Sequence, residues 1–151
     1  MMTYAWHVHH HILVEPVYGG LGTRISYIME TKPAHEQALR LRLLKPIAGD
    51  LPEPVQHAGR AYAEAWRARD QARRAWDEAW RARDDEARRA RDDESSLAYA
   101  EAWRVWDEAW QAYAEAGRVW DEAVKANMSG VLALHASECP QCPWNGATIF
   151  S

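Results

Sequence analysis

The chain has 151 residues, a formal net charge of −4 and two cysteines. Its length allows one domain, and its slightly acidic balance lacks the basic signature of a nucleic-acid-binding protein. No apolar stretch approaches the ~20 residues that a membrane-spanning helix needs, and no signal-peptide pattern follows Met1, so we expect a cytoplasmic protein without membrane contact.

The N-terminal stretch, residues 3–15, alternates large apolar residues with histidines, which predicts a single β-strand. On such a strand His7, His9 and His11 face the same side, where their imidazoles could share one metal ion. The alternative interpretation is a solvated histidine-rich face.

The same stretch resembles the paired-histidine motif of rolling-circle and transposase-type nucleases, because His7-Val8-His9 is soon followed by the apolar run 12–14. In that family two histidines hold a metal while a tyrosine on a helix attacks DNA. The resemblance implies a metal-dependent nuclease or hydrolase, with Tyr27 as the candidate nucleophile. It stands as the enzymatic alternative.

Three short elements are predicted before residue 50. Residues 16–22 contain three glycines and indicate a turn. Helical spacing of apolar residues from Thr23 predicts a helix that Lys32-Pro33 ends. A short helix then opens at Pro33, and the alternation of leucine and arginine over 39–43 favours a strand.

A seven-residue repeat occupies the chain from Ala61 to Lys125. Small residues recur at alternating steps of four and three, which places them on one stripe of a helix. Such an alanine seam predicts a closely packed coiled coil. Its members are Ala61, Ala65, Ala68, Ala72, Ala75, Ala79 and Ala82 in the first arm, and Ala98, Ala102, Val105, Ala109, Ala112, Ala116, Val119 and Ala123 in the second.

A stripe of large residues follows one position after the alanine seam. Its tryptophans are Trp66, Trp76, Trp80, Trp103, Trp106, Trp110 and Trp120. In two antiparallel helices both large stripes fall on one side of the pair. Because so long an apolar face rarely stays bare, we expect it to bind a second copy or another protein partner. The alternative is single-stranded nucleic acid stacked on the tryptophans between arginines.

The repeat is interrupted by a spacer, residues 89–97, where the chain can fold back near Asp93. A hairpin of helices 51–93 and 97–138, the first capped by Asp50 and Glu53, would set Trp76 level with Trp110. One continuous helix is the alternative, because neither glycine nor proline marks the turn. Matched helix lengths favour the hairpin.

The hairpin would return both chain ends to the same place. We therefore predict a mainly α protein, with a long antiparallel two-helix hairpin, residues 51–138, on a small α+β head built from residues 1–50 and 139–151. A head of this size gains stability from a metal ion.

The C-terminal motif His135-x3-Cys139-x2-Cys142 resembles one half of a zinc knuckle. Two thiolates and an imidazole supply three ligands, and one imidazole from His7, His9 or His11 would complete a tetrahedral zinc site. A redox-active thiol pair or two ordinary cysteines are the alternatives. With no catalytic residues identified, the sequence favours a non-enzymatic scaffold protein with a zinc-stapled head.

Overall fold

The computed structural model describes residues 2–88 and 94–150. Within these ranges the protein is mainly helical, with five helices and a small three-stranded antiparallel sheet, which confirms the predicted fold class at that level. The chain divides into two compact units, a terminal unit of residues 1–54 and 127–151 and a hairpin unit of residues 55–126. None of the described helices combines the length and apolarity needed to cross a bilayer.

The sheet of the terminal unit is centred on β1 (Met2–Trp6). Strand β2 (Val14–Tyr18) pairs with it antiparallel, with Trp6 opposite Val14, and β3 (Lys45–Pro46) pairs along its other edge. The prediction of one strand over residues 3–15 is therefore wrong. The chain reverses at His7, whose φ of 53° lies in the left-handed region and whose amide donates to the Leu13 carbonyl at 3.0 Å.

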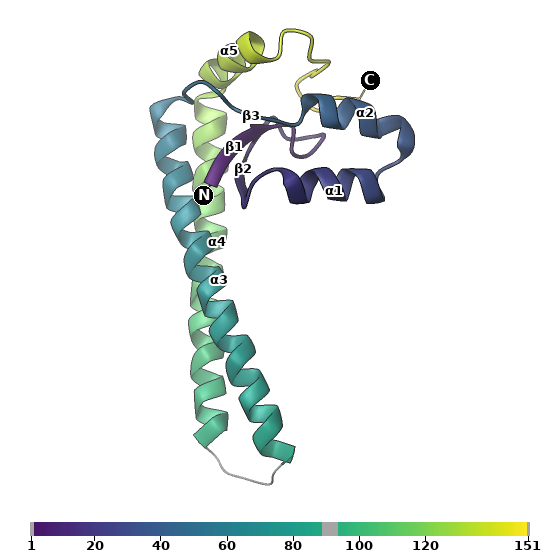
Figure 1. Cartoon of the computed structure of the whole chain (residues 1–151). Coiled ribbons are helices and arrows are strands. Elements are labelled where there is room, and N and C mark those ends of the chain that lie inside the picture. The colour runs from purple at the N-terminus through teal and green to yellow at the C-terminus, as the bar shows by residue number, and fades with distance from the viewer. Residues whose placement is uncertain (1, 89–93, 151) are drawn as a thin grey trace. The chain divides into compact units, whose positions relative to one another are not determined.

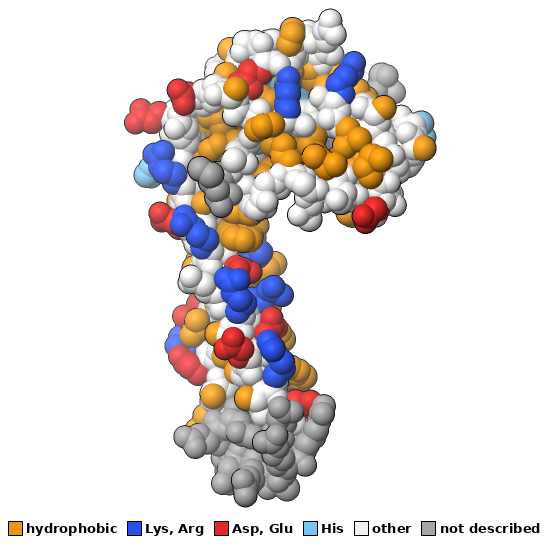
Figure 2. Space-filling model, in the orientation of Figure 1, with side chains coloured by type: hydrophobic (Ala, Val, Ile, Leu, Met, Phe, Trp, Pro, Cys, Tyr) orange, Lys and Arg blue, Asp and Glu red, His pale blue; other side chains and the backbone are white. Residues whose placement is uncertain are grey.

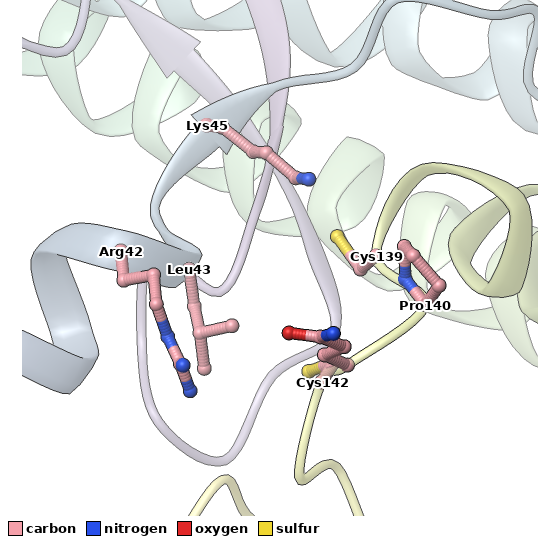
Figure 3. A pocket seen from close by; sticks show the side chains of 7 residues that line it. Arg42, Leu43, Lys45, Cys139, Pro140 and Cys142 are labelled. Atoms are coloured by element: carbon pink, nitrogen blue, oxygen red, sulfur yellow. The ribbon is translucent and has the colours of Figure 1, made fainter.

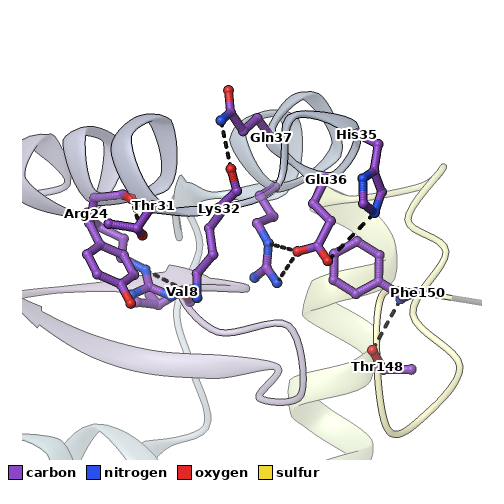
Figure 4. Close-up of polar contacts among 11 residues, drawn as sticks. Val8, Arg24, Thr31, Lys32, His35, Glu36, Gln37, Thr148 and Phe150 are labelled. Carbon is purple, nitrogen blue, oxygen red and sulfur yellow. Dashed lines mark hydrogen bonds and ion pairs between the residues drawn. The ribbon is translucent and has the colours of Figure 1, made fainter.

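Two short helices follow the sheet hairpin and pack against each other (Figure 1). Helix α1 (Gly22–Thr31) confirms the helix expected from Thr23. Helix α2 (Ala34–Leu43) continues through 39–43, so the strand predicted there is wrong. The reason is a buried Arg40, which lies one turn from Glu36 and donates to its carboxylate at 2.6 Å (Figure 4).

The core of the terminal unit joins the sheet to both short helices. Its buried members are Ala5, Val8, Val17, Ile28 and Leu44. The C-terminal tail closes over this unit, because Ile149 is fully buried and its amide donates to the His10 carbonyl at 3.0 Å. The guanidinium of Arg40 lies 4.9 Å from the centre of the Phe150 ring (Figure 4). Residues from both ends of the chain thus share one fold.

Helix α5 (Met128–Glu138) is separate from the helix before it, so the unbroken helix predicted to residue 138 is wrong. The break lies at Asn127. Asparagine is unfavourable inside helices, because its side chain competes with the backbone for hydrogen bonds. Packing within the terminal unit holds α5 against the segment 49–52. A Cβ on Gly130 would lie 2.9 Å from the Pro52 ring and one on Gly49 would lie 2.6 Å from Leu134, so both glycines permit the close approach of α5.

The hairpin unit is built from α3 (Glu53–Arg88) and α4 (Glu94–Ala126), which run antiparallel and pack together (Figure 1). The hairpin prediction is confirmed and the continuous helix is wrong. Helix α3 begins at Glu53, after the expected cap Asp50. The expected pivot near Asp93 lies outside the described residues.

The stripe through which α3 and α4 meet combines alternate members of the alanine seam with alternate members of the stripe of large residues. Ala61, Ala68, Ala75 and Ala82 are exposed, whereas the alanines between them are buried or half-buried. The contact stripe alternates these alanines with large residues, every third or fourth position. Its members are Tyr62, Ala65, Arg69, Ala72, Trp76, Ala79 and Arg83 in α3, and Tyr99, Ala102, Trp106, Ala109, Tyr113, Ala116, Trp120 and Ala123 in α4.

The pairing register also differs from expectation, by about one helical turn. Trp76 stacks on Trp106 at 5.8 Å between ring centres, not on Trp110, and Trp80 meets Tyr99 at 5.7 Å. In this register Arg83 lies 4.2 Å from the centre of the Tyr99 ring. In the observed register the arginines of the contact stripe make cation–π contacts with other rings than those expected.

Candidate metal centre and tryptophan surface

Three side chains that could ligate a metal ion meet in the terminal unit. His7 Nε2 lies 3.0 Å from His135 Nε2 and 3.2 Å from Cys142 Sγ, and all three atoms lie within 4.8 Å of one another. His7 and His135 are buried and Cys142 is half-buried. Within the ranges that the structure describes, this is the group of histidine, cysteine and acidic residues whose geometry could hold a metal ion.

Local backbone structure positions each member of this group. His7 follows the last residue of β1, at the point where the chain reverses. His135 lies in the last turn of α5, and the amide of Cys139 closes that turn on the His135 carbonyl at 2.7 Å. The Cys142 amide then donates to the Cys139 carbonyl at 3.0 Å, so a tight turn returns Cys142 towards the helix end.

Aromatic rings and Glu138 hold the imidazoles in place. The Trp6 ring meets His135 edge-on at 5.0 Å and Trp144 lies 5.5 Å from His7. The carboxylate of Glu138 accepts hydrogen bonds from the Trp6 indole at 2.8 Å and from the Gly49 amide at 2.7 Å. Glu138 thereby joins α5 to β1 and to the segment after β3.

The electrostatics of Glu138 agree with this anchoring role. Burial alone would raise the pKa of Glu138, but hydrogen bonds from Trp6 and from the amides of Gly49 and Ala48 outweigh it and lower the pKa. The carboxylate is therefore ionised at neutral pH. Lys45 donates to the Glu138 carbonyl, at the negative end of the α5 dipole.

Burial sets the protonation of the three clustered groups. Burial, followed by the nearby His135 and Lys45, lowers the pKa of His7 from 6.5 to about 4. Burial and then Lys45 also lower the pKa of His135. Burial raises the pKa of Cys142. Without a metal at neutral pH, the two imidazoles are neutral and the thiol is protonated, so metal binding must release the thiol proton.

Cys139 and Cys142 are free thiols and line one pocket of about 180 Å³ (Figure 3). Arg42, Leu43 and Lys45 line it from α2 and β3, and the amine of Lys45 points towards the turn that carries the cysteines. Cys139 is buried beside the metal-binding group without belonging to it.

The remaining histidines of the N-terminal cluster lie elsewhere. His9 is paired with Glu15, with 2.7 Å between Nδ1 and the carboxylate, and His11 is exposed. The expected placement of His7, His9 and His11 on one strand face is wrong, because β1 ends at Trp6. Tyr27 is exposed on α1 and lines a pocket whose lining residues include no histidine.

The seven tryptophans of the large stripe fall into three groups. Trp120 is buried, and Trp66, Trp76 and Trp106 are half-buried. The indole nitrogens of Trp76 and Trp106 are buried without a hydrogen-bond partner, which is consistent with their packing inside the hairpin. The indoles of Trp80, Trp103 and Trp110 remain 44, 45 and 46% exposed.

Sequence reasoning missed the residues that support the metal-binding group. Trp6 and Glu138 are 132 positions apart in the chain, and no local pattern marks their hydrogen bond. Nothing in the sequence around Glu138 marks this role, because the Ala48 and Gly49 amides from which it accepts lie 90 and 89 positions away in the chain.

Comparison with protein-family models, curated proteins and solved structures found no match to this chain. Its function must therefore be argued from its own residues.

Proposed function

We propose that this protein is a non-enzymatic scaffold that binds protein through the tryptophan side of its hairpin unit and whose terminal unit is closed by zinc. The observation that carries the scaffold role is the exposure of Trp80, Trp103 and Trp110 on a regular helical pair. Large exposed apolar patches on soluble proteins generally mark interaction sites. Aromatic residues are also enriched where protein interfaces gain most of their binding energy.

The zinc assignment rests on the convergence of His7, His135 and Cys142. Neutral imidazoles and a thiolate suit zinc, whose tetrahedral ligand atoms lie roughly 3.3–3.6 Å apart, only slightly farther than the 3.0 and 3.2 Å separations seen here. Cys139 lies outside this three-residue group in the structure, and we assign it as the fourth ligand because it lies in the same turn and lines the same pocket as Cys142, so that metal binding would require its thiol to turn towards the group. A Cys₂His₂ set of this kind is typical of structural zinc.

One feature of the histidine ligand is unusual. His7 Nδ1 is buried without a hydrogen-bond partner, whereas zinc-bound imidazoles generally donate to a carboxylate or carbonyl from their second nitrogen. Ring packing from Trp144 takes over the orienting role in this site. We expect this site to bind zinc more weakly than one with a complete second shell, by about 10- to 100-fold.

Metal analysis of untagged protein tests the zinc assignment. About one zinc per chain is expected under reducing conditions, with loss of that zinc in Cys142→Ser. His11→Gln is the matched control, because His11 is an exposed imidazole outside the group, and it should keep full zinc content. Metal-free wild-type protein, or equal zinc in Cys142→Ser, would contradict the assignment.

Paired tryptophan substitutions test the binding role of the exposed indoles. Trp103→Gln with Trp110→Gln should leave the helix content and urea midpoint of the dilute protein unchanged, because these rings are half in solvent already. The matched variant, Trp76→Ala with Trp106→Ala, should lower stability by roughly 3–5 kcal/mol per residue. Equal destabilisation by both pairs would make the exposed indoles part of the hairpin core, not a binding surface.

The geometry gives little support to the two alternative functions, a metal-dependent nuclease or hydrolase and a single-stranded nucleic-acid-binding protein. A nuclease or hydrolase based on His7, His9 and His11 would need these imidazoles on one metal, and His9 is instead bound to Glu15. Single-stranded nucleic acid would need free arginines between the rings. Arg69 already lies 4.3 Å from the centre of the Tyr113 ring in its own hairpin.

A further inference from the structure

The uncharged surface of the hairpin unit is wider than a two-helix pair requires. The contact stripe is bordered on each side by a second row of residues. We call the first border the tryptophan flank. It comprises Trp66, Arg73 and Trp80 of α3 and Trp103, Trp110, Gly117 and Val124 of α4. The opposite border, the small-residue flank, comprises Ala61, Ala68, Ala75, Ala82, Ala98, Val105, Ala112 and Val119. Two-helix coiled coils generally need only the contact stripe to be apolar, and wider apolar faces are typical of larger bundles.

The indoles of the tryptophan flank are held in place before any partner binds. Trp80 packs on Tyr99, Trp103 lies 5.2 Å from Trp106 and Trp110 lies 6.1 Å from Trp106, measured between ring centres. Each exposed ring thus rests on a ring of the contact stripe. Little side-chain freedom remains to be lost on association, which favours tight binding.

Apart from Arg73, the ion-paired residues in the described part of the hairpin lie outside the tryptophan flank. Arg104 reaches both Glu101 and Glu108, at 2.6 and 2.5 Å, and Arg74 reaches Asp70 at 2.8 Å. Figure 2 shows basic and acidic side chains alternating along the helical face drawn there. The flank itself contains no acidic residue and one basic residue, Arg73, whose guanidinium lies 3.9 Å from the Asp70 carboxylate and 3.8 Å from that of Asp77, both outside the flank.

We propose that the occupant of the tryptophan flank is a second copy of this chain, paired about a two-fold axis as a four-helix bundle. This inference rests on the proposed function, in which the flank is a protein-binding surface. The two arms share the unit Ala-Tyr-Ala-Glu-Ala-Trp-Arg, and both helices present flank indoles in register with its seven-residue period, Trp66 and Trp80 in α3 and Trp103 and Trp110 in α4. A surface built twice from one unit and free of carboxylates is self-complementary, as a two-fold interface requires.

The area of the tryptophan flank suits a weak dimer. From Gly117 to Trp103 and along the facing part of α3 the flank is two helices wide. At 1.5 Å per residue and ~10 Å per helix, it offers roughly 420 Å² per copy. Specific interfaces bury ~800 Å² per partner, so a symmetric pairing of this flank lies at the small end of protein interfaces, where association is weak.

Sedimentation equilibrium over about 0.1–100 µM protein tests this pairing. The wild-type chain should have the mass of a dimer in the upper part of the range. The variant with Trp80→Gln, Trp103→Gln and Trp110→Gln should remain a monomer throughout, with at least a 100-fold weaker dimer constant. The matched control changes Val105→Gln and Val119→Gln, residues of the small-residue flank that are 42 and 43% exposed, and should remain a dimer.

Three outcomes would overturn the pairing. These are a wild-type monomer at every concentration, dissociation by the valine variant alone, or an unchanged dimer in the tryptophan variant. Isotope-filtered NMR on mixed labelled and unlabelled wild-type chains covers the case in which the tryptophan variant misfolds, and indole contacts between copies are expected there. A monomer whose exposed indoles still prove dispensable for stability refutes the second copy and leaves the proposed scaffold role intact.

Discussion

The hairpin unit and the terminal unit reach stable structure by different routes. The hairpin unit repeats one contact along two helices, so any pair such as Trp76 and Trp106 is supported by similar neighbours. The terminal unit depends on single contacts between distant segments, and the one residue Glu138 joins α5 both to β1 and to the segment after β3. Repetition tolerates the loss of a contact, whereas a small unit of single contacts depends on each one and benefits from a metal ion.

Removal of the proposed zinc ion should produce the largest difference in stability between the two units. A chelator should unfold or loosen the terminal unit, because structural zinc contributes apparent binding free energies of ~10–16 kcal/mol in small folds. The hairpin should keep its helical circular dichroism. Residue-resolved hydrogen exchange provides the measurement, with faster exchange expected at β1 and α5 and little change in the middle of α3 and α4. Uniform loss of protection in both units would contradict the comparison.

Acidification should also destabilise the terminal unit, by a smaller amount than zinc removal. In metal-free protein the pKa of His7 is lowered from 6.5 to about 4, so the unfolded chain binds the proton first. Stability is therefore complete above pH 6.5 and falls as the pH drops towards 4, by up to about 3 kcal/mol from this group. Urea titrations from pH 7 to 4 measure it, and His11→Gln should leave the slope unchanged. A flat profile would show that His7 is not buried.

Removing one arginine from the contact stripe should have the smallest effect. Arg83→Met keeps the aliphatic length but loses the cation over Tyr99, at a cost of about 0.5–1 kcal/mol. Arg81→Met is the matched control on the exposed face and should cost less. If both substitutions have the same effect on the urea midpoint, the cation–π contact contributes nothing to the hairpin.

The parts of the fold that were predictable from sequence are those that the repeat determines. The seven-residue period gave the two long helices and their antiparallel packing. The period did not determine which stripe of each helix packs against the other helix, because the alanine seam and the row of large residues are adjacent and have the same period. Cross-helix contacts, such as Arg69 on Tyr113, select between them. These contacts depend on register, which a periodic sequence defines poorly.

The candidate site was predictable only in its ligand types. The spacing of His135, Cys139 and Cys142 indicated a metal site, and the return of the chain indicated a histidine from the N-terminal cluster. The choice of His7 depended on its left-handed backbone, which nothing in the alternating pattern of residues 3–15 revealed. The break at Asn127 was likewise not marked by the helical pattern, and the close packing of α5 against the segment from Gly49 to Pro52 joins residues far apart in the chain.

X-ray absorption spectroscopy at the zinc edge tests the central claim most directly, because it identifies the ligands of the zinc ion that we propose for the terminal unit. Zinc-loaded protein should show two nitrogen ligands at ~2.0–2.1 Å and two sulfur ligands at ~2.3 Å. His7→Gln should replace one nitrogen with oxygen while both sulfurs remain. A zinc shell of oxygen and nitrogen without sulfur, or an unchanged nitrogen shell in His7→Gln, would contradict the assignment of His7, His135, Cys139 and Cys142 as its ligands.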